Sequence, residues 1–423
     1  MKKEVRDGYK MTELGEIPNE WEIIKLNECG YIFGGNAFKS SSFTTEYKEN
    51  DYQVIRMGNV QLGKLDLEKN PVFLSENLVG EKEKKYLLKE ADILISLTGT
   101  VNKTDYGNIS WADKNNKYLL NQRVGCLRND NGEFNNRYYY YLLQSNMFRN
   151  QFFECGVGGT GNQANVSIAD LNNIKVLKLP TREQEKIASI LSTVDEQIDN
   201  VDALIEKNKE LKKGLMQTLL TKGIGHTKLK KTEIGEIPEE WEVKKLEDVC
   251  EILDSKRIPL NEKQRLTMKG DIPYYGANSI VDYINNYLFD STLILLAEDG
   301  GNFFEFKEKP IAFYVEGKCW VNNHAHVLEA KIAESSKWIF YNLVHRDLSN
   351  IVQGGTRAKL NQKDLRNIIV TFPKLEEQQK IASILSEVDN KIEEYENKKE
   401  RLEELKKGLM QQLLSGKIRV IAD

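Results

Sequence analysis

Two long segments of this chain place apolar residues at alternating spacings of three and four. The apolar positions are Ile187, Leu191, Val194, Ile198, Val201 and Ile205 in the first segment, and Ile381, Leu385, Val388, Ile392 and Tyr395 in the second. This spacing is typical of a coiled-coil seam. A run of leucines with a shifted phase follows in each segment, at Leu211, Leu215, Leu219 and at Leu405, Leu409, Leu413, and predicts a local relaxation of the supercoil.

The boundaries of these segments predict helices at residues 181–222 and 375–418. Pro180 and Pro373 stand before their starts, and Gly223 and Gly416 mark their ends. Thr181 and Gln184 have the spacing of a capping box. Because a whole globular region separates the two helices, they can pack antiparallel against each other.

The helices belong to a repeat that spans most of the chain. Residues 12–26 match residues 232–246 at 11 of 15 positions, and residues 183–199 match residues 377–393 at 12 of 17. A third block, residues 210–220, returns as residues 404–414 with 10 of 11 positions identical. Helices of equal length between unlike globular regions suggest a spacer of set length, and a merely stabilising coiled coil is the alternative.

The globular regions read as a mixture of strands and short helices. Residues 92–96 and 293–296 are short apolar runs flanked by turn residues, as expected of buried strands. The aromatic segments 138–143 and 338–343 are expected to be core helices; stacking on nucleic-acid bases is the less favoured reading. We predict an α+β fold with two mixed domains and a pseudo-twofold circular repeat. The expected borders are 1–11 (N-terminal segment), 12–180 (first domain), 181–222 (helix), 223–231 (linker), 232–374 (second domain), 375–418 (helix) and 419–423 (tail).

Composition narrows the class of protein. The net charge of −4 gives no bulk support for nucleic-acid binding, although acidic residues could gather away from such a surface. The five cysteines are scattered without a CxxC pair, which fits a reducing cytoplasm and argues against a zinc module. No apolar run is long enough to predict a membrane span, and the charged start of the chain is unlike a secretory signal.

Signatures of catalysis are missing from the sequence. We find no phosphate-binding loop, dinucleotide fingerprint, HExxH, GxSxG or Asn-Pro-Pro-aromatic motif. His324 and His326 would face the same side of a strand, but no third ligand is suggested by spacing. We therefore expect hydrogen-bonding or DNA-facing histidines, no metal, and no catalytic residues.

Several motifs together resemble the specificity (S) subunit of type I restriction–modification enzymes. Residues 180–191 and 373–385 resemble the family pattern of a proline followed shortly by Glu-Gln-x-Lys-Ile-Ala-x-Ile-Leu. Residues 15–21 and 235–241 are similar to its domain-opening segment, and residues 158–171 and 354–365 to its domain-closing loop. Residues 320–328 resemble a stretch of one class of its recognition domains.

The resemblance implies two target recognition domains that each read one half of an asymmetric bipartite DNA site. It also implies that the repeated helices set the spacer and dock two methyltransferase (M) subunits, which carry S-adenosylmethionine. Restriction (R) subunits would bring ATP and Mg. Residues 1–11 would pair with the region around 221–231 and close a circle. A coiled-coil scaffold that assembles protein partners without touching DNA is the alternative function.

Candidate DNA contacts are polar or glycine-rich turns, because base reading needs donors, acceptors and close backbone approach. In the first domain they are Gly34, Gly35, Asn36, Lys39, Ser40, Arg56, Asn59, Thr98, Gly99, Thr100, Gln122, Arg123, Thr160, Asn162 and Asn165. In the second domain they are Tyr275, Gly276, Asn278, Ser279, Gly300, Gly301, Asn302, Asn323, His324, His326, Thr356, Arg357 and Lys359.

Overall fold

The computed structural model describes residues 5–129, 132–158, 163–354 and 358–420. The chain divides into two compact units, residues 1–201 with 398–423 (unit 1) and residues 202–397 (unit 2). The unit border falls inside both long helices, α4 (Thr181–Lys222) and α9 (Leu375–Leu413). Each unit therefore holds one β-rich region and one end of each long helix.

The remaining helices are short. Unit 1 contains α1 (Asn136–Leu142), α2 (Asn146–Glu154) and α3 (Ile168–Asn173). Unit 2 contains α5 (Leu246–Val249), α6 (Glu262–Thr267), α7 (Ser336–Leu343) and α8 (Gln362–Arg366). Single 3-10 turns are η1 (Leu26–Glu28), η2 (Ser40–Ser42), η3 (Met57–Asn59), η4 (Glu76–Leu78), η5 (Lys84–Tyr86), η6 (Asp254–Lys256) and η7 (Ala333–Ser335).

The β-rich region of unit 1 is built on two sheets. The first has the order β11 (Ile109–Trp111), β9 (Ile93–Ser96), β13 (Val124–Arg128), β4 (Tyr31–Gly34), and the second the order β12 (Tyr118–Leu120), β5 (Tyr52–Ile55), β8 (Phe73–Leu74). Smaller ladders join β10 (Thr98–Thr100), β15 (Gln163–Asn165) and β14 (Val157–Gly158), β16 (Lys175–Lys178) with β3 (Glu22–Lys25), β6 (Val60–Gln61) with β7 (Lys64–Leu65), and β1 (Tyr9–Thr12) with β2 (Gly15–Pro18).

Unit 2 repeats this plan with different residues. Its sheets have the orders β20 (Cys250–Ile252), β27 (Ala325–Ala330), β24 (Leu293–Ala297), β25 (Ala312–Val315) and β22 (Ile280–Ile284), β21 (Lys269–Tyr275), β26 (Lys318–Val321), β23 (Phe289–Asp290). Paired strands are β19 (Glu242–Lys245) with β28 (Ile369–Phe372) and β17 (Leu229–Thr232) with β18 (Gly235–Pro238). In both units the first sheet is antiparallel and the second contains one parallel pair, β5–β12 or β21–β26.

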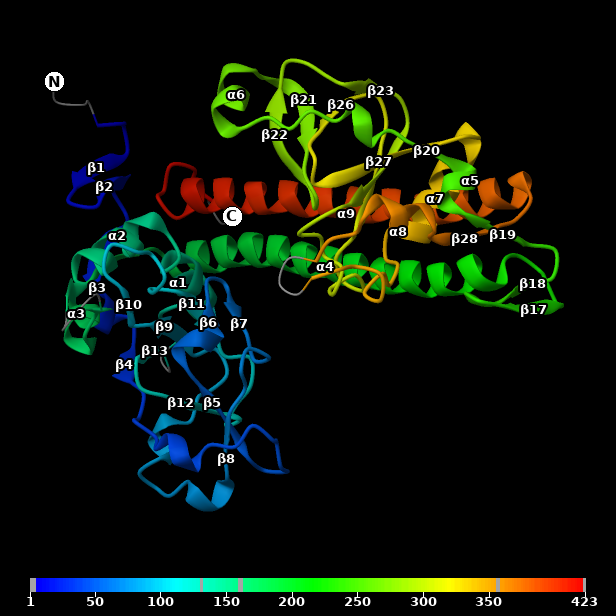
Figure 1. Ribbon diagram of the computed structural model, residues 1–423. Coiled ribbons are helices and arrows are strands. Elements are labelled where there is room, and N and C mark those ends of the chain that lie inside the picture. Colours follow the sequence, from blue (N-terminus) through cyan, green and yellow to red (C-terminus); the bar gives the residue numbers. More distant parts are fainter. Residues whose placement is uncertain (1–4, 130–131, 159–162, 355–357, 421–423) are drawn as a thin grey trace. The chain divides into compact units, whose positions relative to one another are not determined.

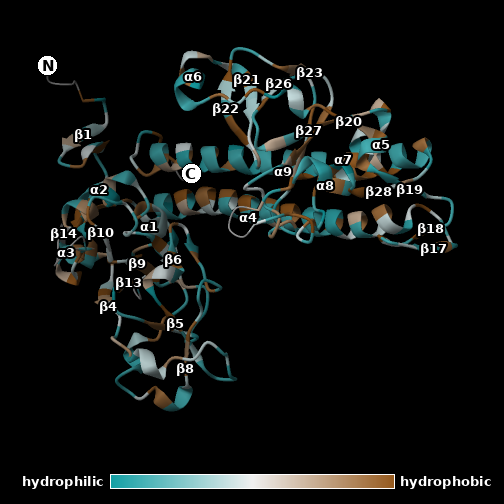
Figure 2. Ribbon diagram, in the orientation of Figure 1, coloured by the Kyte–Doolittle hydropathy of each residue, from teal (hydrophilic) through white to brown (hydrophobic). Residues whose placement is uncertain are grey.

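The prediction of two packed antiparallel helices is confirmed within each unit. In unit 1, Lys406 Nζ lies 2.6 Å from Asp195 Oδ1, and Arg419 Nε lies 2.8 Å from Glu183 Oε1. The later residue of the C-terminal segment thus pairs with the earlier residue of α4, as antiparallel segments require. In unit 2, Lys212 pairs with Asp389 and Lys209 with Glu396 in the same reversed order. Figure 1 shows α4 beside α9, and Figure 2 shows apolar residues recurring along α4 among hydrophilic ones.

The seam is apolar where the heptad spacing predicts it, but not at two of the phase-shifted leucines. Leu191 and Leu385 are fully buried, whereas Leu211 is 51% and Leu405 is 50% exposed. Residues four apart on an α-helix are rotated by about 40°. Three leucines at successive spacings of four therefore cannot share one narrow stripe, and only the last of each run is buried.

The expected capping box at the start of α4 is wrong. The Gln184 side chain donates to Leu179 O at 2.8 Å and accepts from the backbone N–H of Asn135 at 2.9 Å. Gln378 in α9 donates in the same way to Pro373 O at 2.8 Å. These buried amides tie the first turn of each helix to the preceding strand end instead of capping it. The second helix also ends at Leu413, before the predicted residue 418.

The described part of the N-terminal segment forms a hairpin within unit 1, and its expected pairing with residues 221–231 stays a prediction. Tyr9–Thr12 forms a hairpin with Gly15–Pro18, because Gly15 takes the positive φ of 103° that this tight turn requires. Its side chains contact the end of the C-terminal helix: Tyr9 Oη donates to Gly416 O at 2.8 Å. Within unit 1, residues 6–9 thus lie beside residues 416–417.

The aromatic segments are core helices, as expected. Tyr138 to Tyr141 in α1 are at most 3% exposed, and Trp338 and Ile339 in α7 are fully buried. Each unit therefore keeps an aromatic helix between its antiparallel sheet and the long helices, and these rings are not free to stack on bases.

Candidate nucleic-acid interface

Each parallel strand pair ends in a three-residue polar turn. Asn121, Gln122 and Arg123 connect β12 to β13 in unit 1, and Asn322, Asn323 and His324 connect β26 to β27 in unit 2. The carboxyl ends of parallel strands meet at one edge of a sheet, which is a common place for ligand-binding residues. Each turn also joins the two sheets of its β-rich region, so a strand of one sheet fixes its start and a strand of the other sheet fixes its end.

The two turns are held by equivalent backbone hydrogen bonds. Asn121 N donates to Ile55 O at 3.0 Å, and Asn322 N donates to Tyr275 O at 3.1 Å. On the far side, Leu97 N donates to Arg123 O at 2.9 Å, and Glu298 N donates to His324 O at 2.8 Å. Arg123 and His324 therefore occupy equivalent positions, although the surrounding sequences differ.

A cavity of about 360 Å³ in unit 1 (cavity 1) opens beside the first turn. It is lined by Arg56, Met57, Gly58, Asn59, Lys69, Asn70, Asn121, Gln122 and Arg123. Three of these described residues are cations and none is acidic, so the local charge is opposite to the net charge of the chain. A cationic, concave surface suits phosphate and base edges.

Side chains around cavity 1 differ in their exposure and in their hydrogen-bond partners. Gln122 and Arg123 are exposed, and Arg123 adopts a positive φ of 69°, an uncommon conformation that tilts its side chain out of the strand direction. Arg56 Nη2 donates to Asn70 O at 2.5 Å. The Oδ1 atom of Asn121 is buried without a partner among the described residues and is one acceptor that a ligand could satisfy.

The equivalent cavity in unit 2, of about 380 Å³ (cavity 2), is lined by Pro259, Leu260, Arg265, Tyr274, Gly276, Ala277, Val281, Asp299, Gly300, Asn322, Asn323 and His324. His324 Nδ1 lies 2.5 Å from Asp299 Oδ1. When Nδ1–H donates to this carboxylate, Nε2 remains available to contact a base. Cavity 2 thus presents a carboxylate-oriented imidazole where cavity 1 presents a guanidinium.

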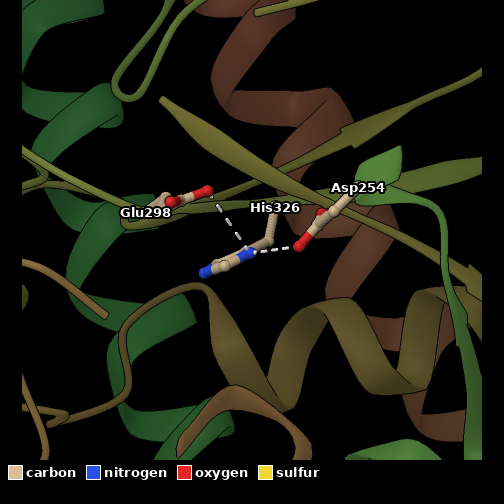
Figure 3. Close-up of side chains that lie close together, drawn as sticks. All are labelled: Asp254, Glu298 and His326. Atoms are coloured by element: carbon tan, nitrogen blue, oxygen red, sulfur yellow. Dashed lines mark hydrogen bonds and ion pairs between the residues drawn. The ribbon is translucent and has the colours of Figure 1, made fainter. Parts of the chain in front are cut away.

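A buried ionic cluster that the sequence did not suggest includes Glu298 and His326, which are close in sequence to the cavity-lining residues Asp299 and His324 (Figure 3). His326 Nδ1 lies 2.7 Å from Asp254 Oδ2 and 3.7 Å from Glu298 Oε2, and His326 Nε2 lies 2.9 Å from Leu360 O. Burial opposes ionisation of Asp254. Hydrogen bonds from His326, the backbone of Val327 and Gln362 nevertheless hold its pKa below the ordinary value. The carboxylate form is therefore part of the folded structure.

The spacing of Asp254, Glu298 and His326 would permit a metal ion, but their other partners favour an ion-pair network. Arg257 Nη1 lies 2.6 Å from Glu298 Oε2, and Lys359 Nζ lies 3.2 Å from Glu298 Oε1. A divalent cation would have to sit against these positive groups, while the network already pairs each carboxylate. We interpret the cluster as support for the loops that form cavity 2.

The structure brings together part of the predicted contact set. Arg56, Asn59, Gln122 and Arg123 line cavity 1, and Gly276, Gly300, Asn323 and His324 line cavity 2. Three of the predicted residues are buried at 3% exposure or less and face inward: Asn59, Thr98 and His326. Their polar side-chain atoms bond Asp66 O and Lys69 O, Asn165, and Asp254 with Leu360 O, respectively, and contact of these three with DNA stays a prediction.

Further predicted residues lie outside the cavity linings. These are Gly34, Gly35, Asn36, Lys39, Ser40, Gly99, Thr100, Asn165, Tyr275, Asn278, Ser279, Gly301, Asn302 and Lys359. Asn278 Nδ2 donates to Gly300 O at 2.9 Å and so links the two loops of unit 2. Thr160, Asn162, Thr356 and Arg357 lie outside the described residues.

Gly35 serves internal packing in this structure. A Cβ at this position would lie 2.0 Å from Asn121 O, so no larger residue fits. The glycine lets the end of β4 approach the turn that carries Gln122 and Arg123. Gly35 thus helps to shape cavity 1, and its expected approach to DNA stays a prediction.

Sequence reasoning missed Lys69, Asn70, Asn121, Arg265 and Asn322, all of which line a cavity. A usable signal was present in the equivalent stretches 119–127 and 320–328, which both place Asn, then Asn or Gln, then Arg or His after an apolar pair. The contributions of Lys69 and Arg265 depend on tertiary structure, and no local pattern marks them.

Comparison with known proteins identifies the class. The family model for the type I restriction modification DNA specificity domain matches residues 18–212 and 238–404, so the chain belongs to this family. It is a specificity subunit of a type I restriction–modification system, with two recognition domains and no catalytic role of its own. Of the two functions that the sequence suggested, family membership favours the DNA specificity subunit over a scaffold that assembles proteins without touching DNA.

Full-length relatives agree. The chain is 28% identical over 443 residues to the type I restriction enzyme MjaVIII specificity subunit of Methanocaldococcus jannaschii, covering 98% of this chain and 96% of the relative. Among solved structures, a type I restriction–modification S subunit from M. genitalium aligns with a TM-score of 0.63 at 18% identity, covering 95% of this chain and 99% of that one. The latter similarity concerns the fold.

Among the described residues, no helix is both long and apolar enough to cross a membrane.

Proposed function

We propose that each recognition domain, 12–180 and 232–374, reads one half of an asymmetric bipartite DNA site at its cavity. The observation that carries the proposal is the equivalence of the two turns. Different sequences build the same backbone hydrogen bonds, and the turns present Gln122 with Arg123 in one domain and Asn323 with the half-buried His324 in the other. A shared frame with different polar side chains is what two unlike half-sites require.

The side chains suggest different readouts. Arg123 could donate a bidentate pair to guanine O6 and N7, and Gln122 could pair with adenine N6 and N7. Lys69 and Arg56 would contact phosphates and set the register of the domain on the duplex. The other exposed candidates, including Lys39, Ser40, Ser279 and Lys359, belong to the same proposal as outer contacts.

The remaining parts of the proposal concern assembly. The helices α4 and α9 are assigned to the spacer and to the docking of two M subunits, and the R subunits join these in the full complex. S-adenosylmethionine would bind the M subunits, and ATP with Mg the R subunits. A cytoplasmic location fits the five cysteines, which are all unpaired.

The test is methylation and binding by the complex of this chain with its M subunits. The methylated-adenine sequence is first mapped in cells, and duplexes carrying it are then titrated at several salt concentrations. Binding should weaken steeply with salt, because phosphate contacts release counterions. Arg123→Ala should lower affinity for the mapped site by about 1–3 kcal/mol and relax one base position.

A matched control is Lys114→Ala, which removes an exposed cation of the same domain that does not line cavity 1. It should leave the base preference unchanged. Equal effects of the two substitutions, or DNA binding that does not depend on salt, would argue against cavity 1 as a reading surface.

A further inference from the structure

Both units contain the same junction of a tyrosine, an aspartate and a lysine. In unit 1, Tyr141 Oη donates to Asp195 Oδ2 at 2.7 Å, and Lys406 Nζ lies 2.6 Å from Asp195 Oδ1. In unit 2, Tyr341 Oη donates to Asp389 Oδ2 at 2.7 Å, and Lys212 Nζ lies 2.6 Å from Asp389 Oδ1. We call these the Tyr–Asp–Lys triads.

Each triad joins three separate elements. The tyrosine comes from the buried aromatic helix of the recognition domain, the aspartate from the long helix that follows this domain, and the lysine from the other long helix. The ammonium group also lies near the tyrosine ring, at 5.7 Å for Lys406 and Tyr141 and 6.0 Å for Lys212 and Tyr341. One carboxylate therefore links a domain to both helices.

The triads are shielded from solvent. The side chains of Lys406 and Asp195 are 19% and 17% exposed, and those of Lys212 and Asp389 are 19% and 32% exposed. Burial first, and the neighbouring carboxylate after it, raise the pKa of Tyr141 and that of Tyr341 well above the ordinary range. Both phenols hence remain protonated donors at neutral pH.

An apolar seam alone tolerates slippage, because a shift by one heptad places similar residues opposite each other. An ion pair between one residue of each helix does not tolerate such a shift. Sliding one helix by seven residues would move a lysine about 10 Å from its aspartate and leave both charges unpaired. The other interhelical pair in unit 2, Lys209 with Glu396, is about half exposed and is a weaker restraint.

We propose that the two Tyr–Asp–Lys triads are positioning residues that hold the register of α4 against α9 and thereby set the DNA spacer that the subunit accepts. That the triads hold the helix register is inferred from their contacts alone. That they set the DNA spacer rests also on the proposed function. The two claims are therefore tested by separate experiments.

The first experiment is a double-mutant cycle on unfolding of the full-length chain, with Asp195→Ala, Lys406→Ala and both together. The unfolding equilibrium constants should show a coupling of at least about threefold. The control cycle uses Lys391 and Glu387, an exposed pair whose two members both belong to α9, and should show less than about twofold. A coupling no larger than that of the control would overturn the proposal.

The second experiment measures methylation by the full complex on duplexes whose spacer is native, one base pair shorter or one base pair longer. Breaking both triads with Asp195→Asn and Asp389→Asn should raise methylation of the altered spacers relative to the native one by about tenfold. Exchanging the charges in both triads, Asp195→Lys with Lys406→Asp and Asp389→Lys with Lys212→Asp, should restore most of the native preference.

A merely structural role would lower methylation on all three duplexes by the same factor, and that result would also overturn the proposal. If the unmodified complex shows no spacer preference, the proposed function fails at that point, and the first experiment still decides the register claim.

Discussion

At the scale of single residues, both cavities depend on groups that do not line them. Gly35 in unit 1 allows the chain to pass against Asn121, and in unit 2 His326 with Asp254 anchors the strand that follows the turn. Such groups act on recognition by fixing the backbone from which the exposed side chains extend.

Gly35→Ala should destabilise the first domain by about 3 kcal/mol or more, because its Cβ would collide with Asn121 O. Urea denaturation measures this change. Gly214→Ala is the control: it lies in α4 with no heavy atom within 4 Å of the added Cβ, and should stabilise by about 0.5–1 kcal/mol. Similar effects at both sites would contradict the close approach described for Gly35.

Asp254 should make the second domain sensitive to acid. Its pKa is lowered in the folded state, so its contribution is present above the unfolded pKa of about 4 and is lost as pH falls through the folded pKa. Asp254→Asn should remove about 1–3 kcal/mol of stability at neutral pH and flatten the acid dependence. Denaturation midpoints between about pH 3 and pH 7 test this.

The exposed Asp271→Asn substitution should retain the acid dependence of the unmodified chain. An Asp254→Asn variant that loses stability in acid as steeply as the unmodified chain would show that this carboxylate is not the source.

At the scale of elements, local periodicity predicted the long helices and the buried strands well. Spacings of three and four are visible in one dimension, and Leu191 and Leu385 lie in the seam as expected. The capping box failed because Gln184 finds partners at Leu179 and Asn135, which only the folded domain supplies. The parallel pairing of β5 with β12 joins residues more than 60 positions apart, and no local pattern specifies it.

Inserting four residues into both α4 and α9 should lengthen each helix by about 6 Å. If these helices set the distance between the half-sites, the methylated sites should then have a spacer one to two base pairs longer. Mapping of methylated adenines in cells that carry the variant provides the measurement. An unchanged DNA spacer with full methylation would show that these helices do not set the distance between the half-sites.

At the scale of the whole molecule, the repeats led correctly to a chain of two similar halves. The same repeats could not reveal that the two turns beside the cavities are also equivalent, because the recognition domains share a backbone frame and little sequence. Asn121 and Asn322 can be matched only after their hydrogen bonds to Ile55 and Tyr275 are known. About a third of the predicted contact residues that the structure describes line a cavity. The sequence could not select these, because the exposure and direction of a side chain depend on tertiary structure.

The most direct test of the account is the genome-wide pattern of methylated adenines after exchange of one reading pair. Gln122→Asn with Arg123→His gives the first turn the residues of the second. The account predicts that one half-site changes or relaxes while the other half-site and the spacer stay the same. A pattern in which both halves are unchanged, or in which both are altered together, would contradict it.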